Sequence, residues 1–308
     1  MIAIHNLTKL YGSVIGVNDI SVDLGAGAHG LLGPNGAGKT TFLGLVTGQL
    51  RPTIGRVLVF GEPPFGNPRV LRRIGYCPAA DLGLGLTTPR EWVRYLVQLS
   101  GFGAAEAAAR ADRTLEQVGL AAASHRPLAT LSKGMRQRAK LAGAIAHDPD
   151  LLVLDEPFDG LDPVARHDLV ELVRSWAKTR SLIVASHLLH EVEALDAGLA
   201  VILGGRLVAS GTATEIRELV DSMPAEIRVR CDEPRRFAEL ACGVEGVEGV
   251  RFEADSVVVA TRQPTLLVER AVMRALDAGL TVREVVAADR SLEGIFGRLV
   301  RLHRGATA

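Results

Sequence analysis

Residues 33 to 40 read Gly-Pro-Asn-Gly-Ala-Gly-Lys-Thr and fit the pattern G-x-x-x-x-G-K-[ST]. Glycines let the backbone wrap around a phosphate group, so that several N–H groups and the positive end of a following helix face the anion. The lysine of such a loop reaches the outer phosphates of a nucleotide, and the hydroxyl after it binds Mg²⁺. The candidate nucleotide-binding residues are therefore Gly33, Pro34, Asn35, Gly36, Ala37, Gly38, Lys39, Thr40 and Thr41.

A second pattern supplies acidic groups. The apolar run Leu151–Leu154 ends in Asp155 and Glu156. A buried strand with this ending places its first carboxylate near Mg²⁺, bound through water, and leaves the second to act as general base on a water molecule. Alternatively, two adjacent acids simply cap the next helix or face solvent. Their combination with the phosphate-binding loop favours the catalytic interpretation.

Five further residues carry weaker signals. They are Tyr11, Ser132 with Gly134 in Leu-Ser-Lys-Gly-Met-Arg-Gln-Arg, Asp162 in Gly-Leu-Asp, and His187 after Ser186. Taken singly, a tyrosine after Leu10 is more often a core residue, and a histidine after an apolar strand is more often structural. Their order along the chain, together with Lys39, Asp155 and Glu156, carries the functional interpretation.

With these motifs in this order, residues 1 to about 220 resemble the ATP-binding cassette (ABC) ATPases. The resemblance implies that Tyr11 stacks on adenine and that His187 contacts the γ-phosphate. It also implies that Ser132 and Gly134 bind the γ-phosphate held by a partner cassette, and that Asp162 lies in a loop crossing to that partner. ATP and Mg²⁺ are the implied cofactors, and a homodimer of cassettes is the simplest assembly.

The chain departs from the family at Ala79, where a glutamine normally touches the metal and the attacking water. A methyl group can do neither. Two hypotheses follow: Asp81 reaches in instead, or the site hydrolyses ATP slowly. In the signature, Lys133 and Met135 replace a glycine and a glutamine, and both variants resemble the exporter branch.

Alternating strand and helix patterns predict an α/β fold for the first part of the chain. The expected strands are 19–24, 29–32, 151–154, 181–185, 199–203 and 206–209. The expected helices are 39–47, 88–100, 104–119 and 132–147, followed by a short one opened by the capping box Thr212–Glu215. The resemblance implies a P-loop NTPase fold, in which a RecA-like core carries an antiparallel β subdomain and a helical subdomain at about residues 85–150.

A composition shift at residues 222–226 predicts a boundary between domains 1–221 and 222–308. The second domain is expected to be a small α+β split βαβ (ferredoxin-like) module. Its expected strands are 226–231, 249–253, 256–261 and 281–288, and its expected helices are 234–241, 265–278 and 291–302. Residues 291–296 are similar to the C-terminal extension of single-cassette exporter ATPases. The second domain is at least as well interpreted as a stabilising or dimerising appendage without a ligand as it is as a regulatory domain.

Composition excludes several classes of protein. The chain has 35 basic and 35 acidic side chains, and this neutrality argues against nucleic acid as a partner. Cys77, Cys231 and Cys242 lack metal-ligand spacing and are expected to be buried free thiols. No apolar run approaches the roughly 18 to 20 residues that span a bilayer, and no secretory signal begins the chain. We expect a cytoplasmic protein held at the membrane by a separate permease subunit.

The sequence therefore predicts the ATP-hydrolysing subunit of an ABC exporter. Chromosome and DNA-repair ATPases with the same motifs need long coiled-coil arms between the phosphate loop and the signature. Lys39 and Ser132 are only 93 positions apart, which leaves no room for such arms. The alternative that remains is a nucleotide-sensing module with weak hydrolysis, because of Ala79.

Overall fold

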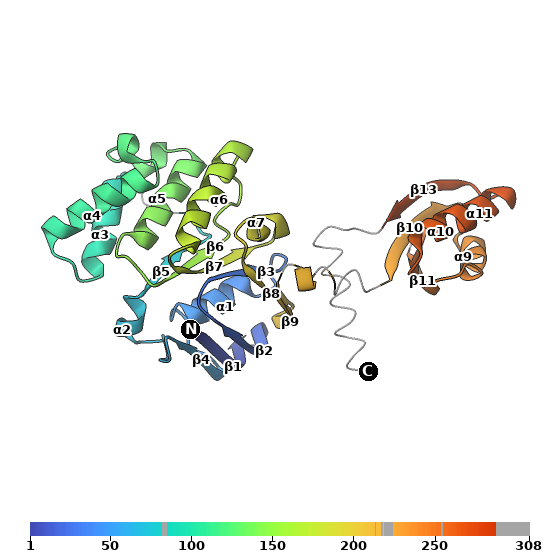
Figure 1. Ribbon diagram of the computed structural model, residues 1–308, viewed down its shortest axis with the longest axis horizontal. Coiled ribbons are helices and arrows are strands. Elements are labelled where there is room, and N and C mark those ends of the chain that lie inside the picture. Colours follow the sequence, from blue (N-terminus) through green and yellow to red (C-terminus); the bar gives the residue numbers. More distant parts are fainter. Residues whose placement is uncertain (82–84, 213, 217, 219–223, 254, 288–308) are drawn as a thin grey trace. The chain divides into compact units, whose positions relative to one another are not determined.

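The computed structural model describes residues 1–308 except 82–84, 213, 217, 219–223, 254 and 288–308 (Figure 1). The chain divides into two compact units, Met1–Ala213 and Thr214–Ala308. Residues around the boundary expected after position 221 lie outside the described part, so that boundary stays a prediction. The expected helix at 291–302 and the motif at 291–296 also lie outside it, as does residue 213 of the expected capping box.

The first unit contains two β-sheets, as the sequence predicts for an α/β fold. An antiparallel sheet has the order β2-β1-β4, and a larger sheet has the order β5-β6-β7-β3-β8-β9, parallel except for its last strand. The strands of the smaller sheet are β1 (Ile2–Tyr11), β2 (Val14–Leu24) and β4 (Ile54–Val59). Those of the larger sheet are β3 (Ala28–Leu32), β5 (Ile74–Cys77), β6 (Leu151–Asp155), β7 (Ser181–Ser186), β8 (Gly198–Leu203) and β9 (Arg206–Gly211).

Helices gather between β5 and β6, and no strand interrupts the described residues of this stretch (Figure 1). They are α3 (Pro89–Leu99), α4 (Ala104–Gln117), two short 3₁₀ turns and α5 (Lys133–Ile145). Thr88 and Glu91 form a reciprocal capping box that begins α3. The remaining helices of this unit are α1 (Lys39–Val46), α2 (Pro68–Leu71), α6 (Pro163–Ala177) and α7 (Leu189–Glu193).

The core of the first unit explains where the polar motifs must lie. All five residues of β6 are buried, as expected for an inner strand of a parallel sheet that is covered on both faces. Leu151 and Val153 of this strand pack in one cluster with Phe42 and Leu43 of α1. Because the strand interior is apolar, polar side chains are left at the strand ends.

The second unit is a four-stranded antiparallel sheet of order β11-β12-β10-β13. Its elements are β10 (Ala225–Cys231), α9 (Pro234–Cys242), β11 (Val247–Glu253), β12 (Ser256–Thr261), a helical segment and β13 (Val282–Ala287). The helical segment comprises α10 (Pro264–Leu267), a π turn at Val268–Val272 and α11 (Met273–Asp277). Ile227 and Val229 of β10 are buried against Phe237 of α9, whereas Arg228 and Arg230 point to the other face.

The cysteine expectation needs one correction. Cys77 and Cys231 are buried free thiols, as expected, but Cys242 is exposed. It is the last residue of α9 and lies at the edge of the face that buries Phe237 and Ala241.

In the part of the chain that the structure describes, no helix is long and apolar enough to span a membrane.

Candidate functional site

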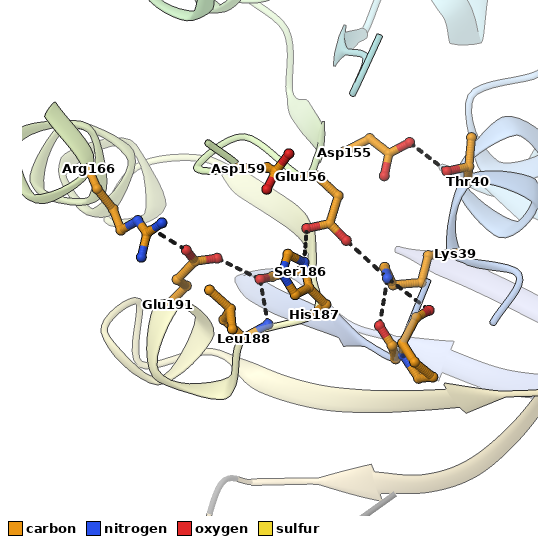
Figure 2. Close-up of polar contacts among 12 residues, drawn as sticks. Lys39, Thr40, Asp155, Glu156, Asp159, Arg166, Ser186, His187, Leu188 and Glu191 are labelled. Carbon is orange, nitrogen blue, oxygen red and sulfur yellow. Dashed lines mark hydrogen bonds and ion pairs between the residues drawn. The ribbon is translucent and has the colours of Figure 1, made fainter. Parts of the chain in front are cut away.

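The candidate site lies where three neighbouring strands end. Strands β6, β7 and β3 are adjacent and parallel, so their carboxyl ends meet at one edge of the sheet. The phosphate-binding loop follows β3, Asp155 and Glu156 are at the end of β6, and Ser186 and His187 are at the end of β7. Figure 2 shows these side chains converging from segments that are far apart in the sequence.

The loop between β3 and α1 requires glycine at two positions. Gly38 precedes α1 with φ of 106°, and a Cβ there would lie 2.4 Å from the carbonyl oxygen of Gly16. A Cβ on Gly33 would lie 2.3 Å from the carbonyl oxygen of Ile202. The first turn of α1 contains no acidic residue. The backbone N–H groups and the positive helix end are therefore available to an anion.

Lys39 connects the loop to the acidic strand end. Its side chain is 6% exposed, and its Nζ lies 2.9 Å from Glu156 Oε1. The same ammonium donates hydrogen bonds to the carbonyl oxygens of Gly33 at 2.6 Å and Pro34 at 3.2 Å. The ammonium group is thus held beside the loop, where a bound phosphate group can replace the carboxylate and the carbonyl oxygens as its partner.

Glu156 sits between two potential proton or charge partners. Its backbone adopts φ of 47°, a left-handed conformation that is unfavourable for a residue with a Cβ. Its N–H donates to the carbonyl oxygen of Ala185 at 3.0 Å, which fixes this conformation. Glu156 Oε2 lies 2.9 Å from His187 Nδ1, while Oε1 faces Lys39. The carboxylate is therefore oriented from both sides.

Asp155 and Thr40 form a pair suited to a divalent cation. Thr40 Oγ1 donates to Asp155 Oδ2 at 2.9 Å, whereas Asp155 Oδ1 is buried with no hydrogen-bond partner among the described residues. Burial raises the pKa of Asp155, and the hydrogen bond from Thr40 opposes that shift. A buried carboxylate oxygen without a donor is costly, and a cation would satisfy it.

These two oxygen donors fit Mg²⁺, which usually takes one or two protein ligands and completes its shell with water and phosphate oxygens. The described ranges contain no cluster of three or more His, Cys, Asp or Glu side chains that could hold a metal ion by themselves. A metal at Thr40 and Asp155 would accordingly depend on a bound nucleotide for further ligands.

A cleft of about 600 Å³ opens beside these groups. The phosphate loop, Glu156 and His187 line one part of it, and Tyr11, Val14 and Ile15 line another. Tyr11 is 46% exposed, so it is not a core residue. An aromatic ring with two exposed aliphatic side chains offers an apolar wall to a flat base. Val14 and Ile15 were not expected from the sequence, because exposed apolar residues have no pattern of their own.

The loop that follows β5 also borders the cleft, through Ala79 and Asp81. Lys140 of α5 is buried and donates hydrogen bonds to three successive carbonyl oxygens, those of Pro78, Ala79 and Ala80, at 2.9, 3.2 and 3.1 Å. Burial lowers the pKa of this lysine. The Asp81 carboxylate lies 2.9 Å from Arg136 Nε, also on α5. The loop backbone is therefore fastened to α5, and the hypothesis that Asp81 replaces the missing glutamine stays a prediction.

Gly33 does not line this cleft, and neither do the three residues expected to act across a dimer interface, Ser132, Gly134 and Asp162. Ser132 accepts a hydrogen bond from the Met135 N–H as the N-cap of α5, and Asp162 accepts from the N–H groups of Val164 and Ala165 as the N-cap of α6. A Cβ on Gly134 would lie 3.5 Å from that of Ala165, so the two helix starts are neighbours. The roles expected for these residues across a dimer interface remain predictions.

Comparisons with known proteins agree with this geometry. A family profile described as ABC transporter matches residues 17–159. The Nod factor export ATP-binding protein I of Cupriavidus metallidurans is 33% identical over 309 aligned positions, covering 99% of this chain and 94% of that protein. The daunorubicin/doxorubicin resistance ATP-binding protein DrrA of Streptomyces peucetius is 32% identical, covering 94% of this chain and 89% of that protein.

Solved structures show the same fold. An ATP-binding subunit of an ABC transporter superposes with a TM-score of 0.64 at 26% identity, over 71% of this chain and 92% of that one. A dimeric bacterial ABC transporter cassette gives a TM-score of 0.63 at 21% identity, over 69% and 98% of the two chains, which supports the P-loop NTPase fold alone. The chain belongs to the ATP-binding subunits of the ABC transporter family, whose cassettes are ATPases.

Proposed function

We propose that this chain powers export by hydrolysing MgATP as part of a cassette dimer, attached to the cytoplasmic face of the membrane through a separate permease subunit. The observation that carries the proposal is the meeting of Lys39, Glu156 and His187 beside the Thr40–Asp155 pair. The names of two relatives, a Nod factor export ATP-binding protein and a daunorubicin/doxorubicin resistance ATP-binding protein, support export as the direction of transport.

In this proposal the residues of the cleft divide the work. Lys39 leaves its carbonyl partners and, with the N–H groups of the loop, binds the β- and γ-phosphates of ATP. Thr40 and Asp155 would hold Mg²⁺, which would supply positive charge to the phosphate oxygens. Glu156 accepts the proton of the attacking water, and His187 holds that carboxylate through its Nδ1 and contacts the γ-phosphate. Tyr11 stacks on the adenine.

A second cassette completes the site. Ser132, Gly134 and Asp162 lie at two neighbouring helix starts and do not line the chain's own cleft, although Lys133, the first residue of α5, borders it. A helix start offers N–H groups and a positive dipole end to a phosphate. This placement supports the proposal that the signature segment of one copy binds the γ-phosphate held by the other copy.

The helical part of the first unit offers a groove as a docking site for the permease. A groove of about 430 Å³ lies between α2, α3 and α5, lined by residues that include Leu71, Leu96, Leu99 and His147. Leu99 is 65% exposed at its rim. Apolar grooves of this kind take the apolar face of an amphipathic helix, which supports binding of a cytoplasmic helix of the permease here.

For the second unit we propose the split βαβ, ferredoxin-like class. Its all-antiparallel sheet has the order β13-β10-β12-β11, and its described elements run β-α-β-β-α-β along the chain. This order supports the class, because each helix connects two strands that flank a third one in the sheet.

The test compares steady-state ATP hydrolysis by the purified chain with and without vesicles containing the membrane protein that copurifies with it. An energy-coupling subunit should change its rate at least twofold with the permease. Empty vesicles and the Lys39→Ala variant are the controls. An ATP hydrolysis rate that is the same with and without the membrane protein would reject the exporter proposal. It would favour the alternative, a nucleotide-sensing module with weak hydrolysis.

A further inference from the structure

A buried carboxylate outside the cleft connects two of the segments that form the site. Glu191 of α7 is 3% exposed, and its carboxylate lies beside Ser186 and Arg166 rather than beside the phosphate loop. Figure 2 shows it between Ser186 on one side and Arg166 on the other. Burying a carboxylate in this way costs hydration free energy, unless hydrogen bonds and ion pairs with its partners offset it.

On one side, the carboxylate fixes the turn that carries His187. Ser186 Oγ donates to Glu191 Oε2 at 2.6 Å and accepts from the Leu188 N–H at 2.9 Å. These two hydrogen bonds hold the residues directly before and after His187. The position of the His187 ring, and hence its 2.9 Å contact with Glu156, depends on that turn.

On the other side, the carboxylate faces the first turn of α6. Arg166 Nε lies 3.6 Å from Glu191 Oε1, and each of these atoms is buried without a hydrogen-bond partner among the described residues. The Arg166 N–H donates to the carbonyl oxygen of Asp162, the N-cap of α6. Two unsatisfied charged atoms that face each other just beyond hydrogen-bond distance can close into a charge-assisted bond after a small shift of α6.

We propose that Glu191 and Arg166 are positioning residues for ATP hydrolysis, which act by linking the turn of His187 to the helix start at Asp162. The inference rests on the proposed function in one respect, the role of His187 at the γ-phosphate. When the loop before α6 moves, as on contact with a second cassette, the ion pair tightens and holds His187 against Glu156. Nucleotide affinity does not depend on the link, because neither residue lines the cleft.

The test measures kcat and KM for MgATP in Glu191→Gln and Arg166→Gln, singly and together. The glutamine at 191 keeps an acceptor for Ser186 but presents no charge to Arg166. We expect kcat to fall about tenfold in each single variant while KM stays within twofold. The double variant should fall no further than the worse single variant, because both substitutions break one interaction. Arg166→Lys, which keeps the cation, should recover most of the rate.

The matched control is the pair Arg174 and Glu171 on the same helix. It has the same 3.6 Å separation, but both side chains are more than half exposed. Arg174→Gln should leave kcat and KM unchanged. A similar loss of kcat in this control would overturn the inference, since any change of charge on α6 would then have the effect.

Repeating the substitutions in a His187→Ala background separates positioning from general destabilisation. There, Glu191→Gln and Arg166→Gln should change kcat by less than twofold. Losses that multiply with that of His187→Ala, or a raised KM at unchanged kcat, would overturn the inference. If Glu191→Gln fails to fold, as judged by its thermal transition, Arg166→Gln decides alone, because its side chain is 32% exposed. If His187→Ala hydrolyses ATP at the normal rate, the role proposed for His187 fails together with the link. If His187→Ala lowers the rate but Glu191→Gln and Arg166→Gln leave it unchanged, only the link is rejected.

Discussion

The two units use charge in opposite ways. In the first unit, Lys39, Asp155, Lys140 and Glu191 are all buried and have specific partners. In the second unit, several ion pairs lie on the solvent-facing side of the sheet. One of them joins Arg230 and Glu284 at 2.9 Å, and both side chains are about half exposed. The buried polar residues that the structure describes there, Ser256 and Thr261, are uncharged.

The difference teaches where chemistry is concentrated. A buried charge costs several kcal/mol to remove from water and is a weak source of stability, whereas an exposed pair contributes about 0 to 1 kcal/mol. The first unit therefore contains buried charged groups that stability alone does not explain. Lys39 and Lys140 line the cleft, Asp155 lies beside it, and Glu191 lies outside it. The second unit has an apolar core and a solvated charged face, which a stable fold alone would require.

The largest expected effect follows from replacing the carboxylate at the centre of the cleft. Glu156→Gln keeps the size of the side chain and one acceptor oxygen but cannot accept a proton. We expect ATP hydrolysis to fall by a factor on the order of 10² to 10⁴ while ATP still binds. Hydrolysis of labelled ATP and equilibrium binding of the nucleotide measure the two quantities, and Glu171→Gln on the exposed side of α6 is the control. Near-normal turnover would remove Glu156 from the mechanism.

Asp155→Asn should have a smaller effect that extra metal can offset. The amide still accepts the hydrogen bond from Thr40, but it offers no charge to Mg²⁺. We expect the Mg²⁺ concentration for half-maximal hydrolysis to rise about 10- to 100-fold, by analogy with the loss of groups that orient metal ligands. A titration with Mg²⁺ at saturating ATP tests this, with Asp168→Asn, an exposed site on α6, as control. An unchanged titration would place the metal elsewhere.

A gain of function is expected at the loop that is fastened to α5. Lys140 holds the carbonyl oxygens of residues 78–80, so a glutamine at position 79 would start from a fixed backbone beside the cleft. If the missing side chain limits the rate, Ala79→Gln should raise ATP turnover severalfold. Asp81→Ala should lower turnover if Asp81 acts in its place. No change in either variant would reject both explanations of the departure from the family pattern.

The sequence predicted those features of the cleft that depend on residues close together in the chain. The glycines at fixed spacing and the apolar strand ending in Asp155 and Glu156 depend on neighbouring residues alone. The structure brings Lys39, Glu156 and His187 together, as the order of motifs predicts. The role of Lys140 was missed because its partners are three backbone carbonyl groups some 60 positions away. Every residue has such a group, so the sequence does not show which ones a lysine will contact. The link from Ser186 through Glu191 to Arg166 was missed for the same reason, since only the tertiary fold places α6 beside α7.

The smallest effect is expected on the charged face of the second unit. Arg230→Ala removes the contacts with Glu284 at 2.9 Å and Asp255 at 3.7 Å, but all three side chains are well exposed. The free energy of unfolding should fall by less than about 1 kcal/mol, less still at high salt, and ATP hydrolysis should stay within twofold. Ile227→Ala on the opposite side of the same strand is the matched comparison, with an expected loss of about 2 to 5 kcal/mol. A several-fold drop in hydrolysis by Arg230→Ala would break the contrast between the units, because an exposed pair that serves stability alone has no means of reaching the chemistry.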